Sequence, residues 1–145
     1  MREQLQIDCA SIMKSAIALN DQWKSFVCKE EEQLTRMSPL AFMMSYAVVR
    51  MNFGRKFGYT KFIGDNATEN DLIIIPKNKH RNLYPMNILT ITLQNVLRNE
   101  LYFAKPFDRI WIDNIPDLYG SRLEDIVRPF NRTRFYYEQS FIIFN

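Results

Sequence analysis

Hydrophobic residues near the start of the chain recur at alternating spacings of four and three. They are Leu5, Cys9, Ile12, Ala16, Leu19, Trp23 and Phe26. This spacing places them along one side of an α-helix and predicts an amphipathic helix. The helix either breaks at Asn20-Asp21, where Asp21 would cap a second helix, or continues to about Leu34. Because Cys9 lies on this stripe, we expect it to be a small buried hydrophobe rather than a reactive thiol.

A second helix is predicted directly after Ser38. Ser38 is a good N-cap, and Pro39 suits the first helical position, where a missing N–H costs nothing. The apolar residues that follow are Leu40, Phe42, Met43, Met44, Tyr46, Ala47, Val48, Val49 and Met51. A helix that is apolar on nearly every side is typical of a buried one. We therefore expect a central helix in which Met44 and Val48 are core residues one turn apart.

Three later segments, 72–75, 109–112 and 135–144, have the composition of short strands. In the last of them, alternation places apolar side chains on both faces, and Glu138 is the only charged residue. That strand should lie centrally in the sheet under helices, or another chain should complete it. Residues 85–101 keep a helical spacing, although Thr90, Ile91 and Thr92 favour a strand.

These elements predict a single α+β domain over residues 1–145. The N-terminal half should be helical, and the C-terminal half should contain a small sheet of about three short strands and further helices. With 47% hydrophobic and 14% aromatic residues, a chain of 145 residues can bury a sizeable core. The sequence contains no repeat, low-complexity tract or linker that would divide it.

Charged residues near the N-terminus bear on the compartment. Arg2, Glu3 and Asp8 interrupt what would be the apolar region of a signal peptide. The longest apolar run is too short to span a bilayer. The chain has only two cysteines, Cys9 and Cys28. We expect a protein of the reducing cytoplasm, without a membrane partner.

Two segments combine basic and aromatic side chains. The first is a connector after the central helix, with Arg55, Lys56, Phe57, Tyr59 and Lys61, and the second lies near the C-terminus, with Arg128, Arg132, Arg134 and Tyr136. Arginine beside aromatic residues is typical of protein-interface hot spots and of single-stranded nucleic-acid sites. The net charge of +3 is too small to require nucleic acid, and composition does not separate the two kinds of partner.

Residues 55–62 also match part of the RNP1 pattern, in which aromatic side chains on a strand stack on RNA bases. The glycine expected at Lys56 and the aliphatic residue expected at Thr60 are missing. A basic connector that ends the central helix explains this segment better.

Few groups in the sequence are suited to catalysis. His80 is the only histidine, which excludes a site with several histidine ligands, and four glycines leave neither a P-loop nor a GxGxxG motif. Asp108, Asp113, Asp117, Glu124 and Asp125 could hold a hard cation, but turn and cap positions explain them. We expect no catalytic residue, no metal and no cofactor.

The function predicted from these observations is that of a small intracellular binding protein that occupies a macromolecular partner. Immunity proteins, antitoxins and phage-encoded inhibitors act in this way. The lack of catalytic groups motivates the prediction, together with a composition rich in Ile, Asn, Phe and Tyr and poor in Gly, which is common where coding DNA is AT-rich. A protein partner is expected at the two basic and aromatic segments. The alternatives are a nucleic-acid-binding module that uses the same segments, and an enzyme built on the carboxylates from Asp108 to Asp125.

Overall fold

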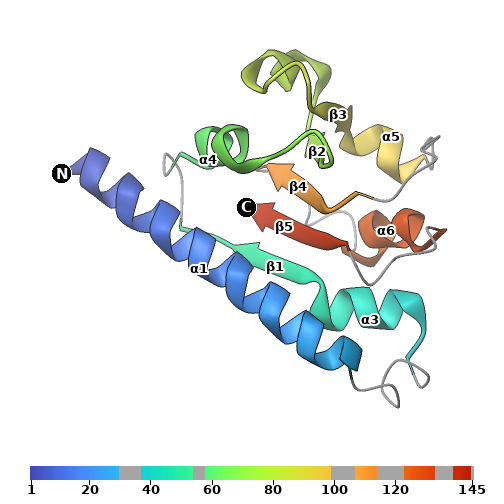
Figure 1. The fold of residues 1–145 in the computed structure, drawn as a ribbon. Helices are drawn as coiled ribbons and strands as arrows, with labels where there is room; N and C mark the ends of the chain where they lie inside the picture. Colours follow the sequence, from blue (N-terminus) through green and yellow to red (C-terminus); the bar gives the residue numbers. More distant parts are fainter. Residues whose placement is uncertain (30–36, 54–57, 99–106, 114–122, 133–138, 145) are drawn as a thin grey trace.

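Five parallel strands form one sheet in the order β1-β5-β4-β2-β3 (Figure 1). The computed structural model describes residues 1–29, 37–53, 58–98, 107–113, 123–132 and 139–144. The strands are β1 (Val48–Met51), β2 (Leu72–Ile75), β3 (Leu89–Thr92), β4 (Arg109–Asp113) and β5 (Ser140–Phe144). Parallel strands cannot be joined by tight turns, so neighbouring strands of this sheet need long crossover connections.

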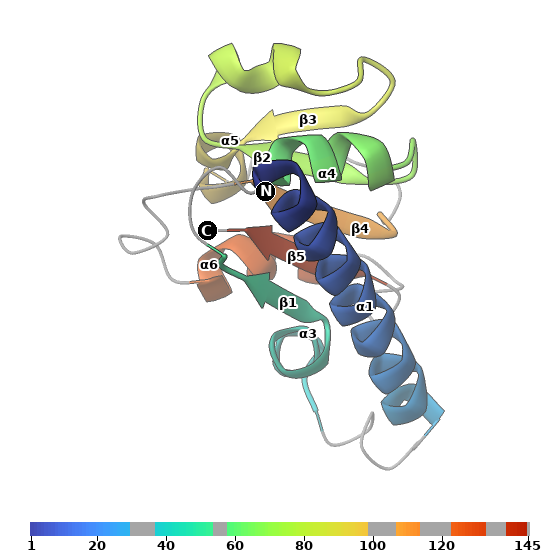
Figure 2. The same cartoon turned by 90° about the vertical axis from the view of Figure 1, so that its left-hand side faces the viewer.

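Helices cover both faces of the sheet, as an all-parallel sheet requires (Figure 2). The long helix α1 (Arg2–Lys29) and the short helix α4 (Tyr59–Asn66) lie on one face, and the 3-10 helix η1 (Asn78–Leu83) joins β2 to β3. The helices on the opposite face are α3 (Pro39–Tyr46), α5 (Leu93–Leu97), α6 (Leu123–Val127) and the 3-10 helix η3 (Arg128–Arg132).

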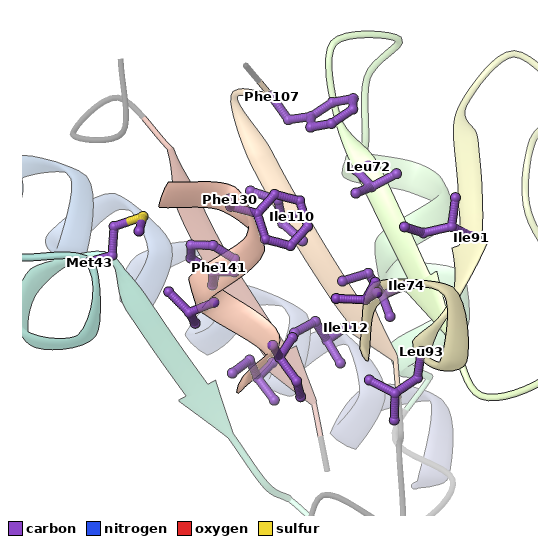
Figure 3. Packing of buried hydrophobic residues seen from close by; sticks show 14 of the residues in the cluster. Met43, Leu72, Ile74, Ile91, Leu93, Phe107, Ile110, Ile112, Phe130 and Phe141 are labelled. Carbon is purple, nitrogen blue, oxygen red and sulfur yellow. The ribbon is translucent and has the colours of Figure 1, made fainter. Parts of the chain in front are cut away.

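Side chains that alternate along each strand build one core on each face. On β4, Ile110 and Ile112 point toward α3, α5 and α6, the core that Figure 3 shows, whereas Trp111 points toward α1 and α4. The ring of Trp111 stacks on Phe144 with 6.4 Å between centroids. The same ring forms a T-shaped pair with Phe62 of α4, with 6.1 Å between centroids.

The expected combination of a helical N-terminal segment, a sheet and further helices is confirmed, but the expected number of strands is wrong. Segments 72–75 and 109–112 are strands, as predicted. Of the predicted strand 135–144, the part from Ser140 to Phe144 is β5, and residues 133–138 lie outside the described part of the chain. β1 and β3 were not predicted, because both are hidden inside segments with helical spacing.

The helix predicted after Ser38 begins as expected. The Oγ atom of Ser38 accepts a hydrogen bond from the backbone N–H of Ala41 at 3.2 Å, and Pro39 is the first helical residue. The helix ends at Tyr46 instead of continuing to Met51. Its predicted start is confirmed, and its predicted end is wrong.

Pairing with β5 explains this end. The N–H of Phe141 donates to the carbonyl of Ala47 at 2.7 Å, and β1 then continues in parallel register with β5. Val48 therefore belongs to a strand and Met44 to a helix, so they are not one helical turn apart. Both side chains are half-buried against the core rather than inside it.

β3 is the second unexpected strand. Ile91 lies opposite Ile74 of β2, and the β-branched residues around it suit a strand in a sheet. Helical structure starts only at Leu93, where Thr92 is the N-cap and its Oγ1 accepts from the N–H of Asn95 at 3.3 Å. Within the described part of this segment, the apolar spacing therefore combines a strand, 89–92, with a short helix, 93–97.

β5 lies between β1 and β4, and all five of its residues are buried. Phe141 and Ile143 face α3, α6 and η3, whereas Ile142 and Phe144 face α1 and α4. This is the central position that was one of the two alternatives for a strand with two apolar faces.

α1 is one continuous helix of 28 residues, without a break at Asn20-Asp21. Cys9 is buried on it, as expected. None of the helices in the described ranges is both long enough and apolar enough to cross a bilayer.

A buried carboxylate at the amino end of β2 gives the first testable prediction. Asp71 is 2% exposed, and its side chain accepts the N–H of Thr68 at 2.9 Å, the N–H of Arg109 at 3.2 Å and the indole N–H of Trp111 at 3.0 Å. Asp71→Asn replaces one of the two acceptor oxygens with an NH2 group, which would face an N–H donor and could not accept its hydrogen bond. We expect urea unfolding to show a loss of about 2–3 kcal/mol.

Glu69→Gln is the matched control, because Glu69 is exposed and lies two residues before Asp71. It should change the free energy of unfolding by less than about 0.5 kcal/mol. Equal effects of the two amides would show that the Asp71 hydrogen bonds do not hold the amino edge of the sheet together.

Candidate functional site on the N-terminal helix

Large apolar side chains are exposed along one side of α1. Their exposed fractions lie between 47% and 67%, and they are Leu5, Ile12, Leu19, Trp23 and Phe26. We call this surface the outer flank of α1. These residues belong to the apolar stripe that the sequence predicts, and they do lie along one side of a helix. Cys9 of the stripe is buried, but the five large side chains of the stripe face away from the core.

A different side of the helix packs on the sheet. Its buried residues are Cys9, Met13, Ile17, Lys24 and Val27. At about 100° per residue, the centre of this inner side lies about 100° around the helix axis from the centre of the outer flank. α1 therefore has two apolar sides, and the fold uses one of them.

Polar contacts locate the outer flank relative to the sheet. The side-chain amide of Asn20 donates to the carbonyl of Tyr46, next to β1, at 2.9 Å, and Lys24 reaches the start of β5. Further round the helix, Asp21 binds Arg109 of β4 at 2.9 Å. Asn20, Lys24 and Asp21 thus follow one another around the helix in the order β1, β5, β4. The outer flank lies on the other side of Asn20, away from Lys24 and Asp21, so it is on the side of the β1 edge of the sheet.

The spacing on the outer flank is that of a helix-pairing seam. Leu5, Ile12, Leu19 and Phe26 are separated by intervals of seven residues, and Trp23 lies four after Leu19. A repeat of seven, with apolar residues every three or four positions, is the pattern by which one helix packs against another.

Trp23 and Phe26 form the most concentrated part of the flank. Their rings stack with 5.5 Å between centroids and 20° between planes, and both side chains are 54% exposed. Rigid aromatic side chains bury a large area at a small cost in conformational entropy, and for this reason they are enriched among interface hot spots.

A polar border with little net charge runs beside the flank. Its exposed residues are Gln4, Asp8, Ser11, Ser15, Gln22 and Lys29. It contains one acidic and one basic side chain, at opposite ends of the helix. Ser11 and Ser15 are small, so a neighbouring helix could approach α1 closely.

Most of the predicted partner-binding residues lie outside the described part of the chain. These are Arg55, Lys56, Phe57, Arg134 and Tyr136, and of Arg132 only the backbone is described, in η3. Their role stays a prediction.

Arg128 is exposed, and its guanidinium forms ion pairs with Glu124 and, at 3.8 Å, with Asp125. All three side chains are largely in water, so these pairs add little stability. The two carboxylates do neutralise part of the positive charge of Arg128 that an acidic partner would bind.

The two described residues of the basic connector lie in different environments. Tyr59 is 8% exposed, its ring stacks on Phe144 at 4.9 Å, and its Oη accepts the N–H of Phe53 at 2.5 Å. Lys61 is exposed and lines a groove of about 490 Å³ between α1 and α4. Both residues belong to a helix, whereas the RNP1 pattern requires a strand.

The carboxylates from Asp108 to Asp125 are not gathered at one place in the described residues. Asp108 directly precedes β4 and Asp113 is its last residue, and Glu124 and Asp125 pair with Arg128. Asp117 is outside the described ranges. Among the residues that are described, no group of three or more His, Cys, Asp or Glu could hold a metal ion.

A second polar cluster lies at the carboxyl ends of the strands, where doubly wound sheets commonly bind ligands. The hydroxyl of Thr60 donates to Asp113 Oδ2 at 2.7 Å, and the hydroxyl of Tyr84 donates to the same oxygen. Burial, followed by the nearby Asp113 charge, raises the pKa of Tyr84 far above its usual range. These groups bind one another and tie α4 and the η1 connection to β4.

A cavity of about 410 Å³ lies at the other end of the sheet, between α1 and the amino ends of β4 and β5. Lys24, which is buried, donates to the carbonyl of Gln139 at 3.0 Å and to Ser140 Oγ at 2.5 Å. Burial raises the pKa of the Cys28 thiol, against the opposing effect of Lys24, so this cysteine is a weak nucleophile. The contacts around this cavity hold α1 to the sheet.

Comparison with known proteins finds no family model, no curated protein and no solved structure that matches this chain. The candidate site therefore rests on the geometry of α1. A signal for it was present in the sequence, because Met13, Ile17 and Val27 form a second set of apolar positions beside the stripe. One helix with two apolar sides has more apolar surface than one contact with a sheet can bury.

The Tyr84 pKa gives a prediction about stability at alkaline pH. A folded-state pKa above the unfolded value means that the contribution of Tyr84 is fully present below about pH 10 and is lost as pH rises further. From about pH 9 to about pH 11, the free energy of unfolding of the wild type should fall more steeply than that of Tyr84→Phe. The difference in slope should approach about 1.4 kcal/mol per pH unit. Urea unfolding measures it.

Parallel curves for the wild type and Tyr84→Phe would mean that Tyr84 ionises in the folded protein as easily as in the unfolded chain.

Proposed function

We propose that this protein is a small binding protein that acts by occupying a macromolecular partner, as an immunity protein, an antitoxin or a phage-encoded inhibitor does. The outer flank of α1 is the observation that supports the proposal. A row of exposed large apolar side chains along one side of a helix, with a polar border, is typical of an interaction site, because covering it with a partner removes it from water.

The chemistry of the flank favours protein over nucleic acid. A surface that binds nucleic acid needs several lysine or arginine side chains to neutralise phosphates. The polar border of α1 has Lys29 and Asp8 as its charged residues, and the rest are neutral. Apolar and aromatic side chains with a neutral border resemble the centre of a protein interface.

The spacing of the flank favours a helical segment in the partner. Residues at intervals of seven, such as Ile12 and Leu19, form a row of knobs that fits between the side chains of a second helix. The partner would thus contribute an amphipathic helix that lies along α1.

Other parts of the proposal rest on fewer observations. The exposed side chains of Arg128 and Lys61 would make polar contacts with a partner separately from the outer flank, because Arg128 lies on η3 on the other face of the sheet and Lys61 lines the groove on the opposite side of α1. We place the protein in the cytoplasm, where thiols such as Cys9 and Cys28, both free here, stay reduced. A nucleic-acid-binding module that uses Arg128, Arg132 and Arg134 is the alternative.

Affinity capture from native host cells tests the proposal. Tagged wild-type protein should recover a stoichiometric protein partner, and Leu19→Ser and Trp23→Ser should each recover at least about tenfold less. Both side chains are exposed, so circular dichroism and urea unfolding should match the wild type.

Leu83→Ser is the matched control, because Leu83 is 58% exposed on η1, away from α1. It should capture the partner as well as the wild type does. Recovery of the same protein by all variants would show that the outer flank is not the binding surface. A sub-micromolar complex with RNA or DNA at physiological salt would support the alternative.

A further inference from the structure

We infer that the outer flank of α1 binds the outer flank of α1 in a second copy of this chain, with the two helices antiparallel. The inference rests on the part of the proposed function that makes this flank a surface for a helix. A second copy of α1 has the same seven-residue spacing over the same length, so its outer flank matches the outer flank of the first copy.

Charge favours the antiparallel orientation. Asp8 and Lys29 are the charged residues of the polar border, and they lie near opposite ends of α1. A parallel pair would place each of them near its own copy, which is repulsive. An antiparallel pair, related by a two-fold axis, places Asp8 of each chain near Lys29 of the other. The two helix dipoles also oppose each other in this arrangement.

The register that pairs Asp8 with Lys29 also matches large side chains with small ones. In heptad terms, Leu5, Ile12, Leu19 and Phe26 occupy position d of the seam, Ala16 and Trp23 occupy position a, and Asp8 and Lys29 occupy the flanking position g. In an antiparallel pair, g of one helix lies near g of the other and a packs in a layer with d. The register that pairs Asp8 with Lys29 therefore layers Leu19 with Ala16 of the second copy, and Trp23 with Ile12. Because of the two-fold axis, each contact occurs twice. Ala16 leaves room for Leu19, and the ring of Trp23 covers the exposed side chain of Ile12.

The contacts of α1 within the fold do not obstruct this pairing. The inner side of α1, with Met13 and Ile17, stays on the sheet and is not needed for the second contact. The flank faces the β1 edge, where β1 has β5 as its one strand neighbour among the described strands. A second α1 in this position would also lie beside that open edge, which proteins generally protect.

Analytical ultracentrifugation of the purified protein tests the inference. The wild type and Leu83→Ser should associate to dimers as concentration rises, and Leu19→Ser should weaken the dimer by at least about tenfold. The fluorescence of Trp23, in a Trp111→Phe background, should shift to shorter wavelength on association, because the ring leaves water. If Trp111→Phe destabilises the fold, sedimentation of the other variants decides.

Charge reversal tests the orientation. Asp8→Lys and Lys29→Asp should each weaken the dimer, and the double variant should restore it, since both charged pairs are then re-formed with opposite signs. Failure of the double variant to restore association would overturn the antiparallel register. A protein that sediments as a monomer up to the millimolar range would overturn self-association altogether.

These outcomes can be told apart from those of the proposed function. A monomeric protein that captures a host partner through Leu19 would contradict the inference and leave the proposed function in place. A dimer that captures no host partner would contradict the proposed function and support the inference.

Discussion

The whole sheet depends on the pairing of its last strand, β5, with β1 on one side and β4 on the other. β1 lies about a third of the way along the chain, and its one pairing in the described structure is with β5. Parallel strands gain their hydrogen bonds only after a long connection has been closed. The fold can therefore become complete only when residues 140–144 have joined it, and a chain that lacks them would leave β1 without a neighbour among these strands.

This position of β5 also decides where helices are needed. Numbered from β2, the strands have the spatial order 2-1-3-4-5 of flavodoxin-like sheets, except that the edge strand β1 comes from the start of the chain. β5 is buried on both faces, so both faces need cover at the β1 side of the sheet. α3 supplies it on one face, and α1 supplies it on the other through residues such as Met13 and Ile17.

The parts of the fold that could be predicted from the sequence are those in which local pattern and tertiary position agree. Leu72–Ile75 is apolar and β-branched, and it is also a central strand. Val48–Met51 continues the apolar pattern of the helix before it, and only its pairing with β5 makes it a strand. The outer flank of α1 was missed for a similar reason, because periodicity shows that a helix has an apolar side but not which neighbour that side meets. The basic segments around Arg55 and Arg134 lie outside the described residues.

The rotation of α1 about its own axis decides which of its apolar sides is left for a partner. A turn of about 100° would bury the outer flank and expose Met13 and Ile17 instead. Hydrophobic burial alone chooses weakly between two apolar sides, since it has no direction. Hydrogen bonds do have direction, and Asn20, Asp21 and Lys24 each reach a fixed group beside or on the strands. These three polar contacts therefore set the rotation of the helix, and by setting it they present Leu19 and Trp23 to a partner.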